Sequence, residues 1–223
     1  MIEMKTLEIS GFQPAIIGMR NPMNSWAKSD SSSELTGYCV GKNDHDLMMK
    51  LRNAGTDHRK FMRMITVYAD ITAPLYWWKE FDTYKVGTVA NSCSTMHKIQ
   101  AKEFVLDDFS HEHLINDYDS DVKDGHKSEW FENLVVTIDR LNCAREKYLE
   151  TKDKKYWWQM IQSLPSSYNQ KRTVMLNYEV LANIYKSRKN HKLDEWRSLC
   201  DWIETLPYGE LITGEDNGDT VQG

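Results

Sequence analysis

The stretch that decides the fold reads HRKFMRMITVYADITAPLYWWKEFDTY and runs from His58 to Tyr84. Between Phe61 and Ala69 the side chains alternate and β-branched residues gather, which predicts a strand. The Ala73-Pro74 pair then indicates the start of a helix, because proline is tolerated at the first helical position. The aromatic run Leu75–Tyr84 continues that helix.

Downstream of this stretch the residue composition of the chain changes twice. Residues 85–95 are small and hydroxylated with few helix formers, and ordered elements flank them, so we expect a shaped loop. Residues 107–128 are rich in acids and histidines, which predicts a short helix and an exposed excursion. Beyond them we expect helices throughout, because apolar residues recur at helical spacing in three stripes. The stripes are Phe131, Leu134, Val135, Ile138 and Leu141, then Val174, Tyr178, Leu181 and Tyr185, and finally Leu193, Trp196, Leu199, Cys200 and Ile203.

Upstream, the alternating run Lys5–Ile9 predicts an edge strand, and the polar residues that follow it to position 38 predict a mobile loop. A helix is expected to begin at Asn43 or Asp44, either of which is a suitable cap, and to end at Ala54. The elements together predict one α/β domain over residues 1–213, with strands mainly in the first half. Residues 214–223 are acidic and glycine-rich, and we expect a disordered tail there.

The composition is that of an ordinary globular protein, 40% hydrophobic and 27% charged. A net charge of −5 argues against binding the polyphosphate backbone of DNA or RNA. Any nucleotide ligand is therefore expected to be a small molecule. The eight tryptophans, with pairs at Trp77-Trp78 and Trp157-Trp158, predict core and subunit-interface packing, and a ring-stacking ligand platform is the alternative.

The cysteine spacing bears on the compartment. The four cysteines lie far apart, with no CxxC or other metal or redox spacing, which is typical of a reduced cytoplasmic setting. We expect no signal peptide and no membrane span, because the first residues lack a charged leader and no apolar stretch is long enough. The cysteines are Cys39, Cys93, Cys143 and Cys200.

The order of elements between His58 and His97 resembles the flavin-dependent thymidylate synthases. In that family a histidine opens a motif, a strand follows, and an Ala-Pro or similar pair leads into a helix that ends in Arg-His-Arg, followed by Ser, Asn-Glu, Ser and Arg. Aligned without gaps, the family histidine falls on His58, a nucleotide-binding glutamine on Glu80 and the triplet on Thr83-Tyr84-Lys85. The first serine falls on Thr88, the Asn-Glu pair on Ala90-Asn91 or Asn91-Ser92, and the nucleotide-contacting serine on Cys93 or Ser94. Only one of the three basic triplet positions is kept, and the family glutamate has no clear equivalent.

A second block near the C-terminus also resembles the family, which has a Leu-Pro pair, an arginine, a helix with an asparagine and an arginine, and then a histidine and an arginine. The corresponding residues are Leu164-Pro165, Arg172, Asn183, Arg188, His191 and Arg197. The two blocks lie within residues 58–197, a span of more than half of the chain.

The resemblance implies a fold, a reaction and a set of roles. The fold would have a central, mostly antiparallel sheet with long flanking helices, in a homotetramer whose active sites combine residues of several subunits. The reaction would be reductive methylation of dUMP to dTMP, with methylenetetrahydrofolate as one-carbon donor and FAD reduced by NADPH. Arg197 would polarise the uracil ring as the catalytic residue, and Glu80, Ser94 and Arg172 would help bind the nucleotide. Contacts to the cofactor would come from His58, Lys85, Thr88, Asn91, Asn183, Arg188 and His191.

The residue types suit this chemistry. Methylating the unactivated C5 of uracil needs a group that stabilises the enolate-like charge, and a guanidinium stays protonated and has a rigid fork. Arg172 and Lys85 are suited to pair with the phosphate. The alternative is that Arg172 and Arg197 are ordinary surface cations and that Thr88, Asn91 and Ser94 form turns.

Two other groups of residues were considered as sites, one for a metal and one for a cysteine nucleophile. His111 and His113, with nearby acids at Asp107, Asp108, Asp117 and Asp119, are the only candidates for a metal site, but positions i and i+2 do not share a helical face. We therefore expect no metal. A nucleophilic Cys93 with His97 as base is a further alternative, although the flavin family does not use a cysteine.

Two functions compete with thymidylate synthesis. The first is a related flavin-linked enzyme of pyrimidine nucleotides with altered chemistry, which the changed Arg-His-Arg and Asn-Glu motifs suggest. The second is a non-catalytic nucleotide-binding homologue that keeps the scaffold and has lost the flavin.

Overall fold

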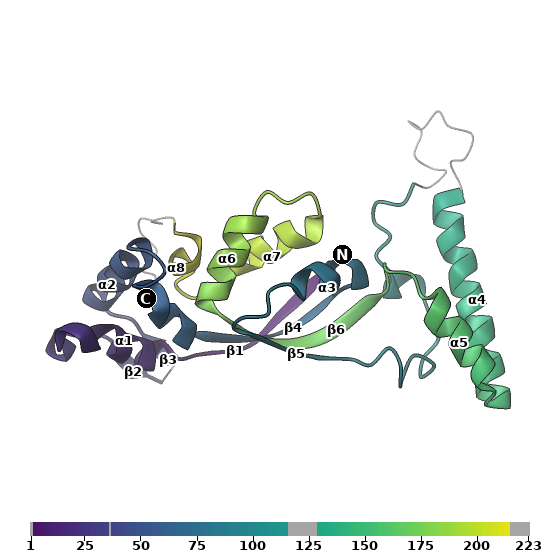
Figure 1. Ribbon diagram of the computed structural model, residues 1–223, viewed down its shortest axis with the longest axis horizontal. Coiled ribbons are helices and arrows are strands. Elements are labelled where there is room, and N and C mark those ends of the chain that lie inside the picture. The colour runs from purple at the N-terminus through teal and green to yellow at the C-terminus, as the bar shows by residue number, and fades with distance from the viewer. Residues whose placement is uncertain (1, 36, 116–128, 215–223) are drawn as a thin grey trace. The chain divides into compact units, whose positions relative to one another are not determined.

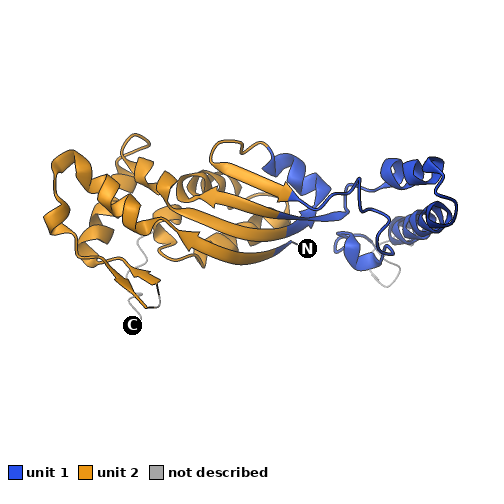
Figure 2. Cartoon of the chain, turned by 90° about the horizontal axis from the view of Figure 1, so that it is seen from below, with its two compact units in different colours: residues 1–3, 72–82, 92–172 blue, residues 4–71, 83–91, 173–223 orange. Residues whose placement is uncertain are grey.

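The computed structural model describes residues 2–35, 37–115 and 129–214 (Figure 1). The chain divides into two compact units (Figure 2). Unit 1 comprises residues 1–3, 72–82 and 92–172, and unit 2 comprises residues 4–71, 83–91 and 173–223. Residues 215–223, in which we expected a disordered acidic tail, lie outside the described residues.

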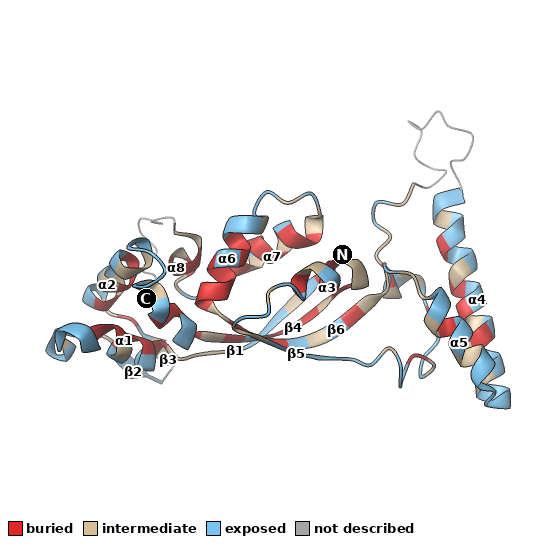
Figure 3. Cartoon of the chain, viewed as in Figure 1, coloured by how far each residue is buried: buried red, intermediate tan, exposed pale blue. Residues whose placement is uncertain are grey.

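The main sheet has four strands in the order β1-β4-β6-β5. Side chains of the two central strands are buried alternately, among them Val67, Ala69 and Ile71 of β4, whereas the edge strand β5 is mostly exposed (Figure 3). This mixed helix and strand fold with an antiparallel sheet confirms the predicted fold class, and β1 lies at an edge as its pattern indicated. The strands are β1 (Glu3–Ser10), β4 (Thr66–Pro74), β5 (Thr88–Ser92) and β6 (Asn169–Asn177).

The α-helices of unit 2 contribute buried side chains to its core. In α7, for example, Trp196, Leu199, Cys200 and Ile203 are buried, which confirms the third predicted stripe within that helix. The α-helices of this unit are α1 (Phe12–Arg20), α2 (Lys42–Asn53), α6 (Tyr178–Arg188), α7 (Asp194–Glu204) and α8 (Glu210–Thr213). It also holds the 3₁₀ helices η1 (Asn21–Met23), η2 (Trp26–Lys28) and η3 (Arg59–Met64) and a hairpin of β2 (Ser32–Glu34) and β3 (Gly37–Cys39).

The mobile loop predicted up to residue 38 is wrong, because this segment contains α1 and the β2-β3 hairpin. A buried carboxylate orders the polar part of it. Asp44 accepts hydrogen bonds from Arg20 Nε at 2.5 Å and from the hydroxyls of Ser29 and Ser31 at 2.6 Å each. Burial acts to raise the pKa of Asp44, but these bonds outweigh it and lower the pKa to about 2. The predicted cap at Asn43 or Asp44 is also wrong, since the N-cap of α2 is Gly41.

Four further segments differ from the sequence prediction. Residues 59–64 form the helix η3, and the strand begins only at Thr66 and runs on to Pro74. The aromatic helix begins at Leu75 as predicted but ends at Phe81. The shaped loop at 85–95 contains β5, and β6 interrupts the region expected to be helical throughout, so Val174 belongs to a strand.

Unit 1 is built around a helical pair and a cluster of aromatic rings. Trp77, Trp78 and Phe81 of α3 are buried and contact one another, which confirms core packing for this tryptophan pair. The helices are α3 (Leu75–Phe81), η4 (Leu106–Asp108), α4 (Glu129–Thr151) and α5 (Lys154–Ser163). Its hydrophobic core consists of Ile99, Phe104, Phe109, Leu134, Ile138, Leu141, Ala144 and Met160.

The first predicted stripe is confirmed at Leu134, Ile138 and Leu141 of α4, whereas Val135 is 39% exposed. None of the helices described here is both long and apolar enough to span a membrane.

Candidate functional site

In unit 2 the loop between α3 and β5 is fixed against the start of α6. Gly87 has φ +78°, and a Cβ there would lie 2.3 Å from Nδ2 of Asn177. Asn177 in turn caps α6, where its side chain accepts the Val180 N–H at 2.9 Å. The hydroxyl of Thr88 donates to the Tyr84 carbonyl and closes the turn. The loop is therefore shaped, as its composition predicted, and Lys85 lies exposed at its surface.

The guanidinium of Arg188, at the end of α6, lies between two aromatic rings. Its Nε donates to the Tyr84 hydroxyl at 2.9 Å, and its Cζ is 4.5 Å from the ring centre of Trp196. The Tyr84 and Trp196 rings meet edge to face with their centres 5.9 Å apart. A cation held over a tryptophan face keeps its charge and has a defined direction. The loop of Tyr84 to Thr88 and the end of α6 are thus brought together, and we call Tyr84, Arg188, His191 and Trp196 the arginine cluster.

His191 joins this cluster through its ring, whose centre is 6.2 Å from that of Trp196. Its backbone N–H donates to the Arg188 carbonyl at 2.9 Å, and its Nδ1 accepts the Leu193 N–H at 3.2 Å. Because Nδ1 accepts this bond, a neutral His191 carries its proton on Nε2.

Arg197 is placed differently from Arg188. Its side chain is 48% exposed, and its guanidinium donates to the carbonyls of His191 at 2.8 Å and Lys192 at 3.3 Å. It also pairs with Asp194 on its own helix. These bonds hold the turn before α7, on which His191 sits.

His58 and Asn183 lie on the η3 side of α6. His58 is exposed at the N-cap of η3. The amide oxygen of Asn183 accepts from Arg59 Nη2 at 3.0 Å. Arg59 also pairs with the buried Glu179 at 3.4 Å, and Arg63 pairs with the same carboxylate. Burial acts to raise the pKa of Glu179, but the two guanidinium groups outweigh it and the pKa is lowered.

In unit 1 the side chain of Arg172 is held from three sides. Its Cζ lies 4.2 Å from the ring centre of Trp78, its Nε donates to Gln170 Oε1 at 3.0 Å, and its Nη1 donates to Asp82 Oδ1 at 2.7 Å. The side chain is only 15% exposed, so Arg172 is not an ordinary surface cation. Its carboxylate partner Asp82 is 54% exposed, which makes that bond accessible to a competing anion.

Ser94 lines two adjoining cavities of about 310 and 320 Å³ in unit 1. The two cavities share Cys93, Ser94, Lys102 and Tyr168. The Ser94 hydroxyl accepts the His97 N–H at 3.0 Å, so these residues form a tight turn as well as a cavity wall. Burial, then the nearby Asp108 and Cys93, raise the pKa of Tyr168 above its ordinary value.

The remaining predicted residues lie outside these contacts. Asn91 is exposed in β5, and Glu80 is half-buried on α3. Within residues 2–35, 37–115 and 129–214, no group of three or more His, Cys, Asp or Glu side chains is arranged to hold a metal ion. Asp117 and Asp119, two of the acids near His111 and His113, lie outside the described residues.

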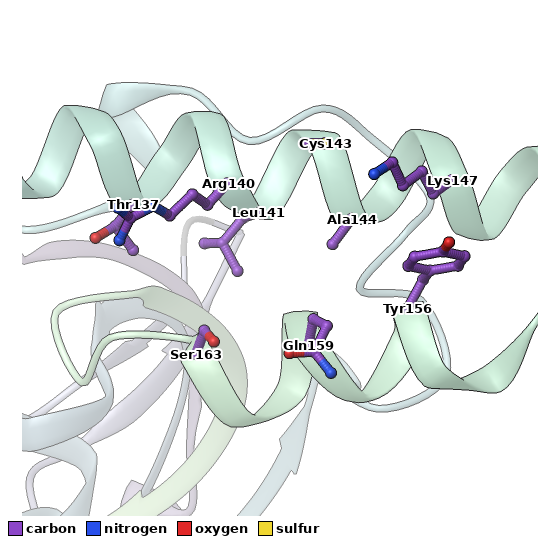
Figure 4. A pocket seen from close by; sticks show the side chains of 9 residues that line it. All are labelled: Thr137, Arg140, Leu141, Cys143, Ala144, Lys147, Tyr156, Gln159 and Ser163. Atoms are coloured by element: carbon purple, nitrogen blue, oxygen red, sulfur yellow. The ribbon is translucent and has the colours of Figure 1, made fainter.

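A further groove of about 390 Å³ runs between α4 and α5 (Figure 4). Arg140, Cys143 and Lys147 reach it from α4, and Tyr156 and Gln159 reach it from α5. Its lining contains none of the described residues that the sequence placed in the site.

Sequence reasoning missed the aromatic partners of both arginines. Trp196 was assigned to the core, where it does lie, and Tyr84 was seen only as a replacement for the triplet histidine. Trp78 was likewise assigned to the core. Trp196 is only eight positions from Arg188, so that pairing could have been noticed, whereas Tyr84 is 104 positions from Arg188.

Solved structures share this fold. No protein-family model and no curated protein sequence matches the chain. Among solved structures, thymidylate synthase X (ThyX) from Helicobacter pylori with FAD and dUMP is similar, with a TM-score of 0.68 and 15% identity over 96% of this chain and 98% of that one. The UMP/dUMP methylase PolB from Streptomyces cacaoi with 5-Br dUMP is also similar, with a TM-score of 0.59 and 14% identity over 92% and 89%. The likeness shows a ThyX-like fold.

Proposed function

We propose that this chain is a flavin-dependent thymidylate synthase that converts dUMP to dTMP. The observation that carries the proposal is the arginine cluster, which sets a directed guanidinium beside the loop that the family resemblance assigns to flavin and nucleotide. The ThyX-like fold supports it, since the two similar proteins are a thymidylate synthase with FAD and dUMP and a UMP/dUMP methylase.

The residues present suit an anionic nucleotide beside a flavin. When bound, FAD would supply hydride to the uracil and accept it from NADPH, and methylenetetrahydrofolate would supply the one-carbon unit. His58, Lys85, Thr88, Asn91, Asn183 and His191 are the residues proposed to contact the cofactor. They offer cationic, hydroxyl, amide and imidazole groups, which fit the diphosphate and the polar edge of the flavin ring.

The step at the uracil ring needs a cation directed at its carbonyl. C5 becomes nucleophilic when enolate-like negative charge is held on the ring carbonyl oxygen, and a preorganised guanidinium stabilises that charge before C5 attacks the one-carbon unit. The sequence assigned this role to Arg197, but the geometry favours Arg188, because Tyr84 and Trp196 fix its direction. In this proposal Arg197 positions His191 through its carbonyl bond. Arg172, Ser94 and Glu80 of unit 1 are the proposed nucleotide contacts in an active site that combines residues of several subunits, where Arg172 exchanges Asp82 for the phosphate.

The quaternary structure belongs to the same proposal. The long pair α4 and α5 exposes Trp130, Val136 and Trp158 by 59%, 42% and 42%. Exposed large apolar side chains on one helical pair are typical of a subunit interface. These side chains support an oligomer, and the family resemblance leads us to propose a homotetramer, which sedimentation equilibrium will test; a monomer at micromolar concentration would contradict it.

Two readouts on the same purified protein separate the competing functions. We expect a yellow protein that releases tritium from C5-labelled dUMP when FAD, NADPH and methylenetetrahydrofolate are all present. Bound flavin without release would favour an altered reaction on a pyrimidine nucleotide. A protein that stays colourless after incubation with FAD would favour a non-catalytic binding protein.

A further inference from the structure

The groove between α4 and α5 lies wholly within unit 1 and contains none of the residues proposed for the active site (Figure 4). Its volume of about 390 Å³ is in the range of small-molecule sites. Small side chains on the two facing helices, at Cys143 and Ala144 of α4 and Ser163 of α5, leave this space open. An inference about this groove is therefore independent of the proposed function.

Two cations stand toward the two ends of the groove. Arg140 and Lys147 are seven residues apart, or two helical turns, so they project from the same face of α4 with about 10 Å between them along the helix axis. Both are exposed, and neither pairs with a carboxylate of any residue that the structure describes. The Lys147 ammonium lies 5.7 Å from the ring centre of Tyr156, which holds that cation at its end of the groove.

The space between the two cations is apolar on one side and polar on the other. Leu141 and Ala144 line the floor, and Figure 4 shows both side chains pointing from α4 toward α5. Tyr156, Gln159 and Ser163 are spaced three and four residues apart, so they share one face of α5 and offer hydroxyl and amide groups along the opposite wall. A compact anion in this groove reaches only one of the two cations and leaves the apolar floor uncovered.

We propose that this groove binds an elongated organic dianion with an acid group at each end and an apolar middle. One acid group pairs with the Arg140 guanidinium, whose planar fork matches a carboxylate, and the other pairs with the Lys147 ammonium. The chain between them lies over Leu141 and Ala144. A linear dicarboxylic acid is the simplest ligand of this kind.

Calorimetric titration of the purified chain with sebacate tests the groove, because the extended sebacate chain spans about the distance between the two cations. We expect a dissociation constant of about 0.1–1 mM, which suits two exposed ion pairs and a short apolar chain. The carboxylates of succinate are too close together to reach both cations, and the monomethyl ester of sebacate keeps the length but has one charge. Each should bind about threefold to fivefold more weakly than sebacate.

Variants and a thiol reaction locate the binding. Arg140→Gln and Lys147→Gln should each weaken sebacate binding by about threefold with an unchanged melting temperature. The control Lys154→Gln removes an exposed lysine of α5 outside the groove lining and should bind like the wild type. Saturating sebacate should slow the alkylation of Cys143 by iodoacetamide, whereas the exposed Cys39 of unit 2 should react at an unchanged rate.

Each outcome decides the proposal. No binding by the wild type at about 10 mM sebacate, or equal affinities for sebacate, succinate and the monoester, would overturn it. Wild-type affinity in both groove variants would do the same, as would a Cys143 that reacts equally fast with and without sebacate. A Cys143 that is unreactive even without ligand would place the groove inside a subunit contact and also overturn the proposal. None of these readouts involves flavin or dUMP, so a chain that binds sebacate as expected but does not methylate dUMP keeps this inference and loses the proposed function.

Discussion

Replacing Arg188 by lysine keeps the positive charge and removes the fork on which the arginine cluster depends. The substitution deletes the Nε donor to Tyr84, a bond of 2.9 Å, and the guanidinium plane 4.5 Å from the Trp196 ring centre. A hydrogen bond from a charged group contributes about 1.5–3 kcal/mol, and a cation over a tryptophan about 1–2 kcal/mol. Because lysine recovers part of the second contribution, we expect the free energy of unfolding to fall by about 2 kcal/mol.

The effect on turnover should be larger than the effect on stability. A preorganised donor aimed at developing charge is worth about 10²–10³ in kcat, so Arg188→Lys should lower the rate of tritium release from C5-labelled dUMP by that factor. The matched variant Arg197→Lys changes an exposed side chain paired within its own turn, and we expect a stability change below about 0.5 kcal/mol and turnover within about threefold.

The same two variants can also refute the assignment of the catalytic guanidinium to Arg188. If Arg197→Lys loses about 10²-fold in kcat while Arg188→Lys retains its rate, the sequence-based assignment of the catalytic guanidinium to Arg197 is correct and the geometric argument is not. Thermal unfolding of both variants confirms that a lost rate is not a lost fold.

Three further predictions concern the framework. The pKa of Asp44 is about 2 in the folded protein against an ordinary 3.8. The ionised carboxylate therefore contributes about 2 kcal/mol to the free energy of unfolding above about pH 5, and this contribution is lost toward pH 2. Asp44→Asn should flatten that part of the pH–stability curve, and an unchanged curve would contradict the network. Gly87→Ala should lower the free energy of unfolding by about 2 kcal/mol. Gly55 has a similar positive φ but open space around it, so Gly55→Ala should lower it by less. Equal losses in chemical denaturation would show that the contact between residue 87 and Asn177 does not matter. Arg172→Gln should weaken dUMP binding by about tenfold in calorimetry, whereas Asp82→Asn, which frees the guanidinium, should not weaken it. If both variants weaken binding, the Arg172–Asp82 pair has a structural role and does not bind the phosphate.

Local periodicity predicted the buried faces well. Helical spacing predicted the buried faces of α4 and α7, and alternation predicted β1, because each depends on residues close in sequence. The helix α1 was missed because Gly11, Pro14 and Gly18 look like breakers. Pro14 stands in the first turn, where a missing N–H costs no hydrogen bond, and Gly11 lies before the helix at φ +97°.

The candidate site was predictable only in part. Arg172 and Arg188 were both singled out by their place in the C-terminal block, and both are held by aromatic rings. What the sequence lacks is the partner of each, because Trp78 lies 94 positions from Arg172 and Tyr84 lies 104 positions from Arg188, and they meet only through the fold.

The most direct test of the account is the flavin absorbance spectrum of the purified protein during titration with dUMP and, separately, with deoxyuridine. The account predicts a bound flavin whose visible bands shift on addition of dUMP, with much weaker binding of deoxyuridine because Arg172 lacks a phosphate to pair with. A flavin-free protein, or a bound flavin whose spectrum is unchanged by saturating dUMP, would contradict a shared flavin and nucleotide site.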